Sequence, residues 1–336
     1  MSHPPHPGLR ITAGWGPYPG HIPPALTLNT TRIITWLDCE REATYRFILN
    51  RERDRLKSQA LQIGTLWHSV VEAIQSKAKV PDAKLLAEQA AAEADEAGLD
   101  NMAKDLRKFA LMVEPAIEVY TRLYANGTPT GITLAVEQEF WLLLEFPPDF
   151  PVLLRGCLDK VGYTPEKGLI NGECKTVSAS EDMARYVTER SKHLQDQLYF
   201  LALYYAPIPA EWHQKAGCEI PLTPYGTVYD LFSKKDYPQK ASHGFTVEER
   251  IAQWERSIFY TQAVHFNLSK CMDAVEEVYQ VARRWGGPYL PNRRACRDYQ
   301  NIRCDFYDTC YRDTPLSSTY YRDREPDYVD EVNRHA

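Results

Sequence analysis

The sequence predicts an α/β fold in which a small central mixed β-sheet is flanked by helices. Short β-like runs separated by turn signals occupy residues 132–177, and segments with helical periodicity precede and follow them. This order of elements is typical of an α/β core with helical additions. The 336 residues, of which 44% are hydrophobic and 25% charged, suffice for a sizeable core and exclude full-length disorder and a fibrous repeat.

The N-terminal part is predicted to be an irregular arm followed by helices. Residues 1–30 are rich in Pro, Gly and His, which favours loop structure. A helix with a basic end is expected over 31–57, and a second over 62–78, where apolar residues recur at helical spacing. Residues 82–126 are rich in Ala and Glu and then amphipathic, so we expect one or two further helices that carry no chemistry.

The middle and C-terminal parts alternate between strand and helix. The turn sequences PPDFP and PEKG separate three β-like runs that follow one another along the chain. A tail rich in Pro, Arg and Cys begins at residue 286. The predicted elements are strands at 132–146, 152–163, 168–177 and 225–232, and helices at 181–206 and 246–285.

Charge and hydropathy limit the environment in which the chain is expected to work. A net charge of -6 gives no global basic field, but a local basic cleft remains compatible with it because charge is screened over about 10 Å. No run approaches the roughly 18 apolar residues of a membrane helix, and the first 30 residues lack the apolar region of a signal peptide. We therefore expect a cytoplasmic protein, in which the eight cysteines are thiols or metal ligands instead of disulfides.

Two carboxylates and a lysine form the pattern that points most directly to chemistry. Asp159 lies late in the second predicted strand, and Glu173 and Lys175 lie in the third. Because side chains alternate along a strand, Glu173 and Lys175 should share one face, which Asp159 reaches if the strands form a hairpin. Such carboxylates bind a hard divalent cation, and the ammonium can stabilise charge at a phosphate. An acid-x-Lys pair on a strand is also common as a solvated ion pair.

Two helical motifs accompany this pattern. His68 lies on the second predicted helix, where a neutral imidazole could complete a metal shell. Gln195 and Tyr199 are four residues apart, so they share one face of a helix and could hydrogen-bond a phosphate or the lysine. Taken singly, a histidine on a mostly apolar helix is more often a core residue, and Gln and Tyr are ordinary on amphipathic helices.

Taken in order, these motifs resemble the RecB-like branch of the PD-(D/E)XK nuclease superfamily. The pattern in that family is a His on an early helix, then G-x-x-D, D/E-x-K and Q-x-x-x-Y. The resemblance covers about residues 31–312 and implies a restriction-endonuclease-like core. The matching residues of this chain are His68, Gly156-Cys-Leu-Asp159, Glu173-Cys-Lys175, and Gln195 with Tyr199.

The resemblance implies a deoxyribonuclease that hydrolyses phosphodiester bonds with Mg²⁺ or Mn²⁺. An exonuclease on single-stranded DNA or DNA ends is expected, in recombination, repair, or phage or CRISPR DNA processing, in the cytoplasm of a bacterium or a phage-infected cell. Glu137 lies where the family often has a strand Glu and is given only a weak role. The implied site residues are His68, Asp159 and Glu173 as metal ligands, Lys175 as the catalytic lysine, and Gln195 and Tyr199 as further catalytic residues.

Four cysteines form a second candidate metal site. Cys296, Cys304 and Cys310 cluster in the tail at a C-x7-C-x5-C spacing that differs from a zinc ribbon, and Cys39 is the candidate fourth ligand. One Cys before the nuclease motifs and three after them resembles the iron–sulfur subset of these nucleases, which includes AddB-type and CRISPR spacer-acquisition enzymes. The resemblance implies a [4Fe–4S] cluster that joins the helical N-terminal and C-terminal segments. A structural Zn²⁺ ion and free thiols are the alternatives.

About 150 residues per domain gives a prior of roughly two domains, but a single large domain with insertions is also compatible with the length. We interpret the chain as one nuclease domain between an N-terminal arm and a polar tail. The expected segments are the arm at 1–30, the domain at 31–312 with a helical insertion at 82–126, a catalytic core at 132–232, a long helix at 246–285 and a cluster segment at 286–312, and the tail at 313–336.

Two other function classes stay open at this level. The same fold could hold DNA without cutting it, although a silent fold need not keep the acidic residues and the lysine. It could also be a partner-dependent subunit of a recombination or DNA-processing complex, for which the Ala- and Glu-rich helices would supply a protein interface. Unaided cleavage by the isolated chain separates the nuclease from both alternatives.

Overall fold

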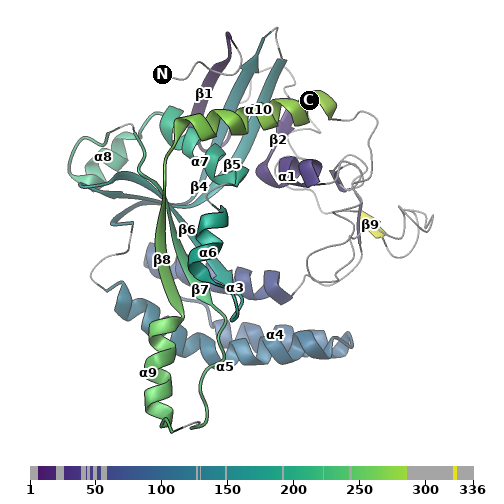
Figure 1. The fold of residues 1–336 in the computed structure, drawn as a ribbon, viewed down its shortest axis with the longest axis vertical. Helices are drawn as coiled ribbons and strands as arrows, with labels where there is room; N and C mark the ends of the chain where they lie inside the picture. Colours follow the sequence, from purple (N-terminus) through teal and green to yellow (C-terminus); the bar gives the residue numbers. More distant parts are fainter. Residues whose placement is uncertain are drawn as a thin grey trace.

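A seven-stranded mixed sheet flanked by helices organises the protein, which confirms the predicted α/β class (Figure 1). None of the helices in the described part of the chain is both long and apolar enough to span a membrane. The computed structural model describes residues 7–19, 26–38, 43, 46–47, 51–53, 59–125, 128, 130–147, 150–190, 193–221, 223–241, 244–285 and 321–323.

The sheet has the strand order β1-β4-β5-β6-β7-β8, and β2 pairs with β5 off this path. The pairs β6–β7 and β2–β5 are parallel and the others antiparallel. A separate pair joins β3 and β9. The strands are β1 (Arg10–Trp15), β2 (Leu26–Leu28), β3 (Arg51–Arg53), β4 (Ile132–Phe146), β5 (Phe150–Thr164), β6 (Gly168–Val177), β7 (Gly226–Ser233), β8 (Phe259–His265) and β9 (Tyr321–Asp323).

The sheet divides where β5 and β6 separate. These strands pair only from Thr164 opposite Gly168 to Lys160 opposite Gly172. Beyond that point β5 continues beside β4 and β2, whereas β6 continues beside β7. We call this divergence the fork. The fork splits the sheet into two halves, one with β1, β2, β4 and β5 and the other with β6, β7 and β8. In Figure 1 the first half lies above the second.

Helices cover the sheet and create two hydrophobic cores. The first core packs α1, α7 and α10 against the sheet, and the second is built by α3, α4 and α5. In the second core, Trp67 of α3 stacks on Phe232 of β7 with ring centroids 4.0 Å apart. The helices are α1 (Thr30–Asp38), α3 (Gln59–Ser76), α4 (Ala83–Glu96), α5 (Asp100–Leu123), α6 (Met183–Arg190), α7 (Leu194–Tyr205), α8 (Ala210–Ala216), α9 (Val247–Ser257) and α10 (Leu268–Arg284).

Most of the predicted elements are confirmed, because their hydrophobic patterns are long and unambiguous. The strands predicted at 132–146 and 168–177 have these bounds in the structure, and that predicted at 152–163 lies within β5. The helix predicted at 62–78 is α3, and the segment 82–126 contains α4 and α5.

The expectation of an irregular arm over 1–30 is wrong, since β1 and β2 lie within it. Gly14 weakens the strand signal of β1, yet the position requires it. A Cβ atom on Gly14 would lie 2.5 Å from the indole of Trp141, which occupies that space. The neighbouring strand β4 therefore requires glycine at position 14, although a glycine by itself favours a loop.

Three helix predictions also need correction. The helix expected at 31–57 is wrong at its end, because residues 51–53 form β3 and pair with β9. The helix expected at 181–206 is two helices, divided at His193, whose backbone is extended. The long helix expected at 246–285 contains β8, a run of aromatic and β-branched residues that pairs with β7. The helical patterns of α9 and α10 on either side conceal this strand.

Candidate active site

The fork brings together the two carboxylates and the lysine. Asp159 is the residue of β5 that follows the last paired position toward the fork, and Glu173 has the same place on β6. The Lys175 ammonium lies 2.5 Å from Glu173 Oε1 and 3.8 Å from Asp159 Oδ2. Asp159 Oδ2 also accepts a hydrogen bond of 3.3 Å from the backbone N–H of Cys174. The separation of two strands thus creates the space in which these side chains meet.

His68 and Glu137 approach Asp159 from other elements. His68 of α3 places Nδ1 3.8 Å from Asp159 Oδ2 and Nε2 2.6 Å from Glu137 Oε1. Glu137 is opposite Asp159 in the sheet, because its neighbours Val136 and Gln138 pair with Lys160 and Leu158. Its φ of 47° is left-handed, which is uncommon for a residue with a side chain and is frequent at functional sites.

These three side chains offer a donor set that suits a divalent cation. Ligand atoms of His68, Glu137 and Asp159 all lie within 4.8 Å of one another. Carboxylate oxygens fit Mg²⁺ or Mn²⁺, and an imidazole nitrogen fits Mn²⁺ and later transition metals better than Mg²⁺. Of the expected ligands, the structure brings His68 and Asp159 together and adds Glu137. Glu173 lies beside them, with its side chain 2% exposed and paired with Lys175.

The charges of the site support one another. The hydrogen bond with Glu137 raises the pKa of His68, and the same bond from His68 lowers the pKa of Glu137. Burial alone would lower the pKa of the Lys175 ammonium, but Glu173 and Asp159 outweigh it and hold that pKa above its ordinary value. Lys175 is therefore a cation at neutral pH and does not act as a base.

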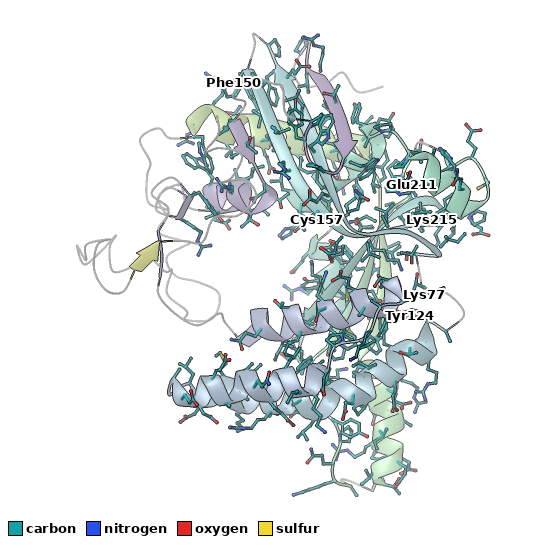
Figure 2. The ribbon with its side chains drawn as sticks, turned by 180° about the vertical axis from the view of Figure 1, so that it is seen from behind. Lys77, Tyr124, Phe150, Cys157, Glu211 and Lys215 are labelled. Carbon is teal, nitrogen blue, oxygen red and sulfur yellow. The ribbon has the colours of Figure 1, made fainter. Side chains whose placement is uncertain are left out.

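The cysteines beside the carboxylates are not nucleophiles. Burial raises the pKa of the Cys157 and Cys174 thiols, so neither is a thiolate at neutral pH. The Cys157 thiol donates to Glu137 Oε2 at 3.5 Å. Figure 2 shows Cys157 along β5, well away from the Phe150 end of the strand. Both thiols are small, weakly polar neighbours of the charged groups.

Two pockets meet at His68, Glu72 and Cys174. The outer pocket lies between α3 and the C-terminal part of β6, and Tyr186 of α6 borders it. The inner pocket lies behind the carboxylates, between α3 and the sheet, and contains Asp159, Glu173 and Lys160. The outer pocket is lined by Gly64, Thr65, Trp67, His68, Ser69, Glu72, Glu137, Cys174, Lys175, Thr176 and Tyr186.

Polar residues of the inner pocket make hydrogen bonds that no sequence motif predicted. Tyr124 donates to Asp230 at 2.8 Å, and Lys160 donates to Thr128 at 2.7 Å. Burial raises the pKa of Asp230 to about 6 and lowers that of Lys160 to about 8. Tyr124 follows the last residue of α5, near the base of the sheet (Figure 2). These residues are single polar positions on separate elements, so their proximity has no local sequence signal.

Gln195 and Tyr199 support the site from the other face. Gln195 Nε2 donates to the Tyr199 hydroxyl at 2.8 Å, along one face of α7. The Tyr199 ring is buried and meets Phe140 edge-on, with centroids 5.5 Å apart. Neither residue lines the outer or the inner pocket. Their spacing is as predicted, and the structure places Tyr199 in the first core with the half-buried Gln195 beside it.

The candidate cluster cysteines Cys39, Cys296, Cys304 and Cys310 lie outside the described residues. Tyr186 and Glu137 are the site residues that sequence reasoning missed or gave too little weight. Glu137 is one of three acids on its strand, so its type alone does not single it out, and Tyr186 on a short polar helix has no signal either.

Comparisons with known proteins bear on this geometry. A family model described as the PD-(D/E)XK nuclease superfamily matches residues 27–310, most of the chain. A search of curated proteins finds no match.

Proposed function

The chain belongs to the PD-(D/E)XK nuclease superfamily, and we propose that it is a metal-dependent deoxyribonuclease acting at the outer pocket. The observation that carries this proposal is the meeting of His68, Glu137 and Asp159 beside the Lys175 ammonium. Three ligands from three elements and one half-buried cation are the groups that hydrolysis of a phosphodiester needs.

The side chains have separate roles in this proposal. His68, Glu137 and Asp159 would hold Mg²⁺ or Mn²⁺, which supplies an activated water and neutralises charge on a phosphate oxygen. Lys175 stabilises the negative charge that develops at phosphorus, because its carboxylate neighbours hold it protonated. Glu173 fixes the position of Lys175 through the 2.5 Å ion pair and completes the acidic set of the fork.

We further propose an exonuclease on single-stranded DNA or on DNA ends. The order of the motifs from His68 to Tyr199 supports it, since that order resembles the RecB-like branch. The test uses single- and double-stranded DNA labelled separately at each end, with Mg²⁺ or Mn²⁺ against EDTA. Metal-dependent shortening from one end supports the exonuclease, and the label lost first gives the polarity. Internal cuts in circular single-stranded DNA contradict it.

The same assay addresses the two rival functions. Binding of DNA with no cleavage under any metal would favour a non-cutting module. Cleavage that appears only when a cell extract is added, and that Lys175→Ala abolishes, would favour a partner-dependent subunit. The presence of both carboxylates and the lysine at one fork supports the unaided enzyme.

For the four cysteines we propose a [4Fe–4S] cluster, supported by their number and their arrangement around the nuclease motifs. Protein purified without oxygen should contain iron and acid-labile sulfide and absorb visible light. Cys304→Ala should remove both and lower the melting temperature, whereas Cys218→Ala, an exposed thiol outside the set, should change neither. Stoichiometric zinc without sulfide would establish the alternative metal, and unchanged spectra and melting would contradict the cluster.

A further inference from the structure

A third pocket lies near the outer pocket and uses adjoining residues of the same two segments. The outer pocket uses Gly64 of α3 and Thr176 of β6, and the third pocket uses Ile63 and Ser178, one and two residues further along those segments. The pocket is also lined by α5 and by Lys234 and its neighbours, which follow β7. We call this third pocket the distal pocket. It encloses about 450 Å³, which is within the range of ligand pockets.

Lysines give the distal pocket its chemical character. Lys108 pairs with Asp105 at 3.8 Å and with Asp236 at 3.4 Å, so its charge is already compensated. Lys235 Nζ donates to the carbonyl of Ser257 at 3.2 Å, and it makes no ion pair with a carboxylate among the described residues.

Lys234 is half-buried and has no ion pair with a carboxylate in the part of the chain that the structure describes. Burial lowers the pKa of Lys234 and the Asp105 carboxylate offsets this only in part, so a further counter-charge would favour the ammonium. An anion bound there would supply it.

The parallel pairing of β6 and β7 fixes the distance of these lysines from the catalytic centre. Lys175 is opposite Leu231, so Lys234 is three residues further along the same direction. Its backbone N–H still donates to the carbonyl of Val177 at 3.0 Å, which keeps it beside β6. Three residues span about 10 Å, and a nucleic acid strand advances about 3.4 Å per nucleotide when stacked.

We propose that the distal pocket binds the backbone phosphates of the DNA strand, up to about three nucleotides from the phosphodiester at Lys175, through Lys234 and Lys235. This inference rests on the proposed function and adds a substrate-binding subsite to it. The distal pocket lies at the carboxyl ends of β6 and β7, which is where parallel strands commonly bind ligands. The subsite positions the strand and takes no part in the chemistry.

The test measures binding separately from cleavage. Full-length Lys175→Ala protein is titrated against fluorescent single-stranded DNA by anisotropy, at several salt concentrations and with Mg²⁺. Adding Lys234→Gln should weaken binding by about five- to tenfold and reduce the salt slope by about one, because one phosphate contact is lost. Lys235→Gln should act in the same direction. Lys270→Gln, which removes an equally charged exposed lysine on α10, should change neither.

A second measurement separates this inference from the proposed function. With Lys175 intact, Lys234→Gln should retain turnover of bis(p-nitrophenyl) phosphate, which is too short to reach the distal pocket, and should lose affinity only for oligonucleotides. Equal DNA affinity and salt slope in Lys234→Gln and its parent would overturn the subsite while leaving cleavage untouched. If the wild-type protein does not cleave DNA but Lys234→Gln still weakens DNA binding, the proposed function is overturned and the subsite is kept.

Discussion

Tyr199 lies against the buried backbone of Gly156. A methyl group on Gly156 would be 3.4 Å from the Tyr199 ring and 2.6 Å from the ring of Phe140, both of which are buried. The glycine of the G-x-x-D motif and the tyrosine of the Q-x-x-x-Y motif are thus in packing contact through one face of β5. The glycine is required for space, and the tyrosine fills that space.

Gly156→Ala should therefore destabilise the fold. A Cβ contact below 3.0 Å forces Phe140 to move within a filled core, which costs about 1–3 kcal/mol in the free energy of unfolding. Urea denaturation measures this change. The matched control is Gly64→Ala, where the nearest atom is Thr176 Oγ1 at 3.6 Å and a helical alanine is favoured. Equal stability of Gly156→Ala and wild type would show that the packing adapts freely.

Glu137→Gln tests whether Glu137 binds the metal. The substitution removes one charged ligand from the His68, Glu137 and Asp159 set, so we expect the Mn²⁺ affinity to fall by at least about tenfold. Calorimetric titration gives the affinity without cleavage. Glu139→Gln is the matched control, since Glu139 is two residues along the same strand and pairs with Arg155 at 3.6 Å. If both variants bind Mn²⁺ like wild type, Glu137 is not a ligand.

Lys175→Ala should lower the cleavage rate by at least about 100-fold, because the cation beside the phosphate is lost. The substitution also leaves the buried Glu173 carboxylate without its 2.5 Å partner, which destabilises the fold. The double variant Glu173→Gln/Lys175→Met removes both charges and should recover stability while staying inactive. Single-turnover cleavage and melting temperature distinguish the two effects. Cleavage by the double variant at the wild-type rate would remove Lys175 from the mechanism.

Asp230 should make stability depend on pH in the acid range. Its pKa is about 6 in the folded protein against 3.8 as the ordinary value, so folding takes up a proton between these limits. The contribution of Asp230 to stability is then greatest below about pH 4 and is lost as pH rises to 6, by up to about 3 kcal/mol.

Asp230→Asn removes this titration while keeping a group that can accept from Tyr124. The difference in unfolding free energy between wild type and Asp230→Asn should decrease from pH 4 to 6 and be constant above that range. Chemical denaturation at each pH measures it, and other titrating groups cancel in the difference. A constant difference across the whole range would contradict a raised pKa of Asp230.

Local patterns explain which parts of the structure could be predicted. The strands β4 and β6 and the helix α3 have long, regular hydrophobic periods, and the motif residues Asp159, Glu173 and Lys175 follow from their order within these elements. Their meeting at one fork was expected from strand alternation and hairpin pairing. The fold class needed little more than this.

Tertiary pairing explains what could not be predicted. The glycine of β1 is explained only by the neighbouring Trp141, which fills the space of a side chain. Strand β8 is distinguished from the helices on either side only by its pairing with β7. The place of Glu137 opposite Asp159 follows from the register of β4, which no single strand reveals. The contact of Tyr124 with Asp230 joins residues 106 positions apart. Each of these features depends on a contact between two segments that are far apart in the sequence.

The two hydrophobic cores give the candidate metal centre a mechanical consequence. His68 belongs to α3 and the second core, whereas Glu137 and Asp159 lie on β4 and β5, whose buried residues build the first. A metal ion bound by His68, Glu137 and Asp159 would link the two cores. We expect the metal-free protein to melt in two steps, with α3, α4 and α5 released first, and saturating Mn²⁺ to merge them into one transition at higher temperature. Binding of the metal would then both complete the active site and make the two cores unfold together.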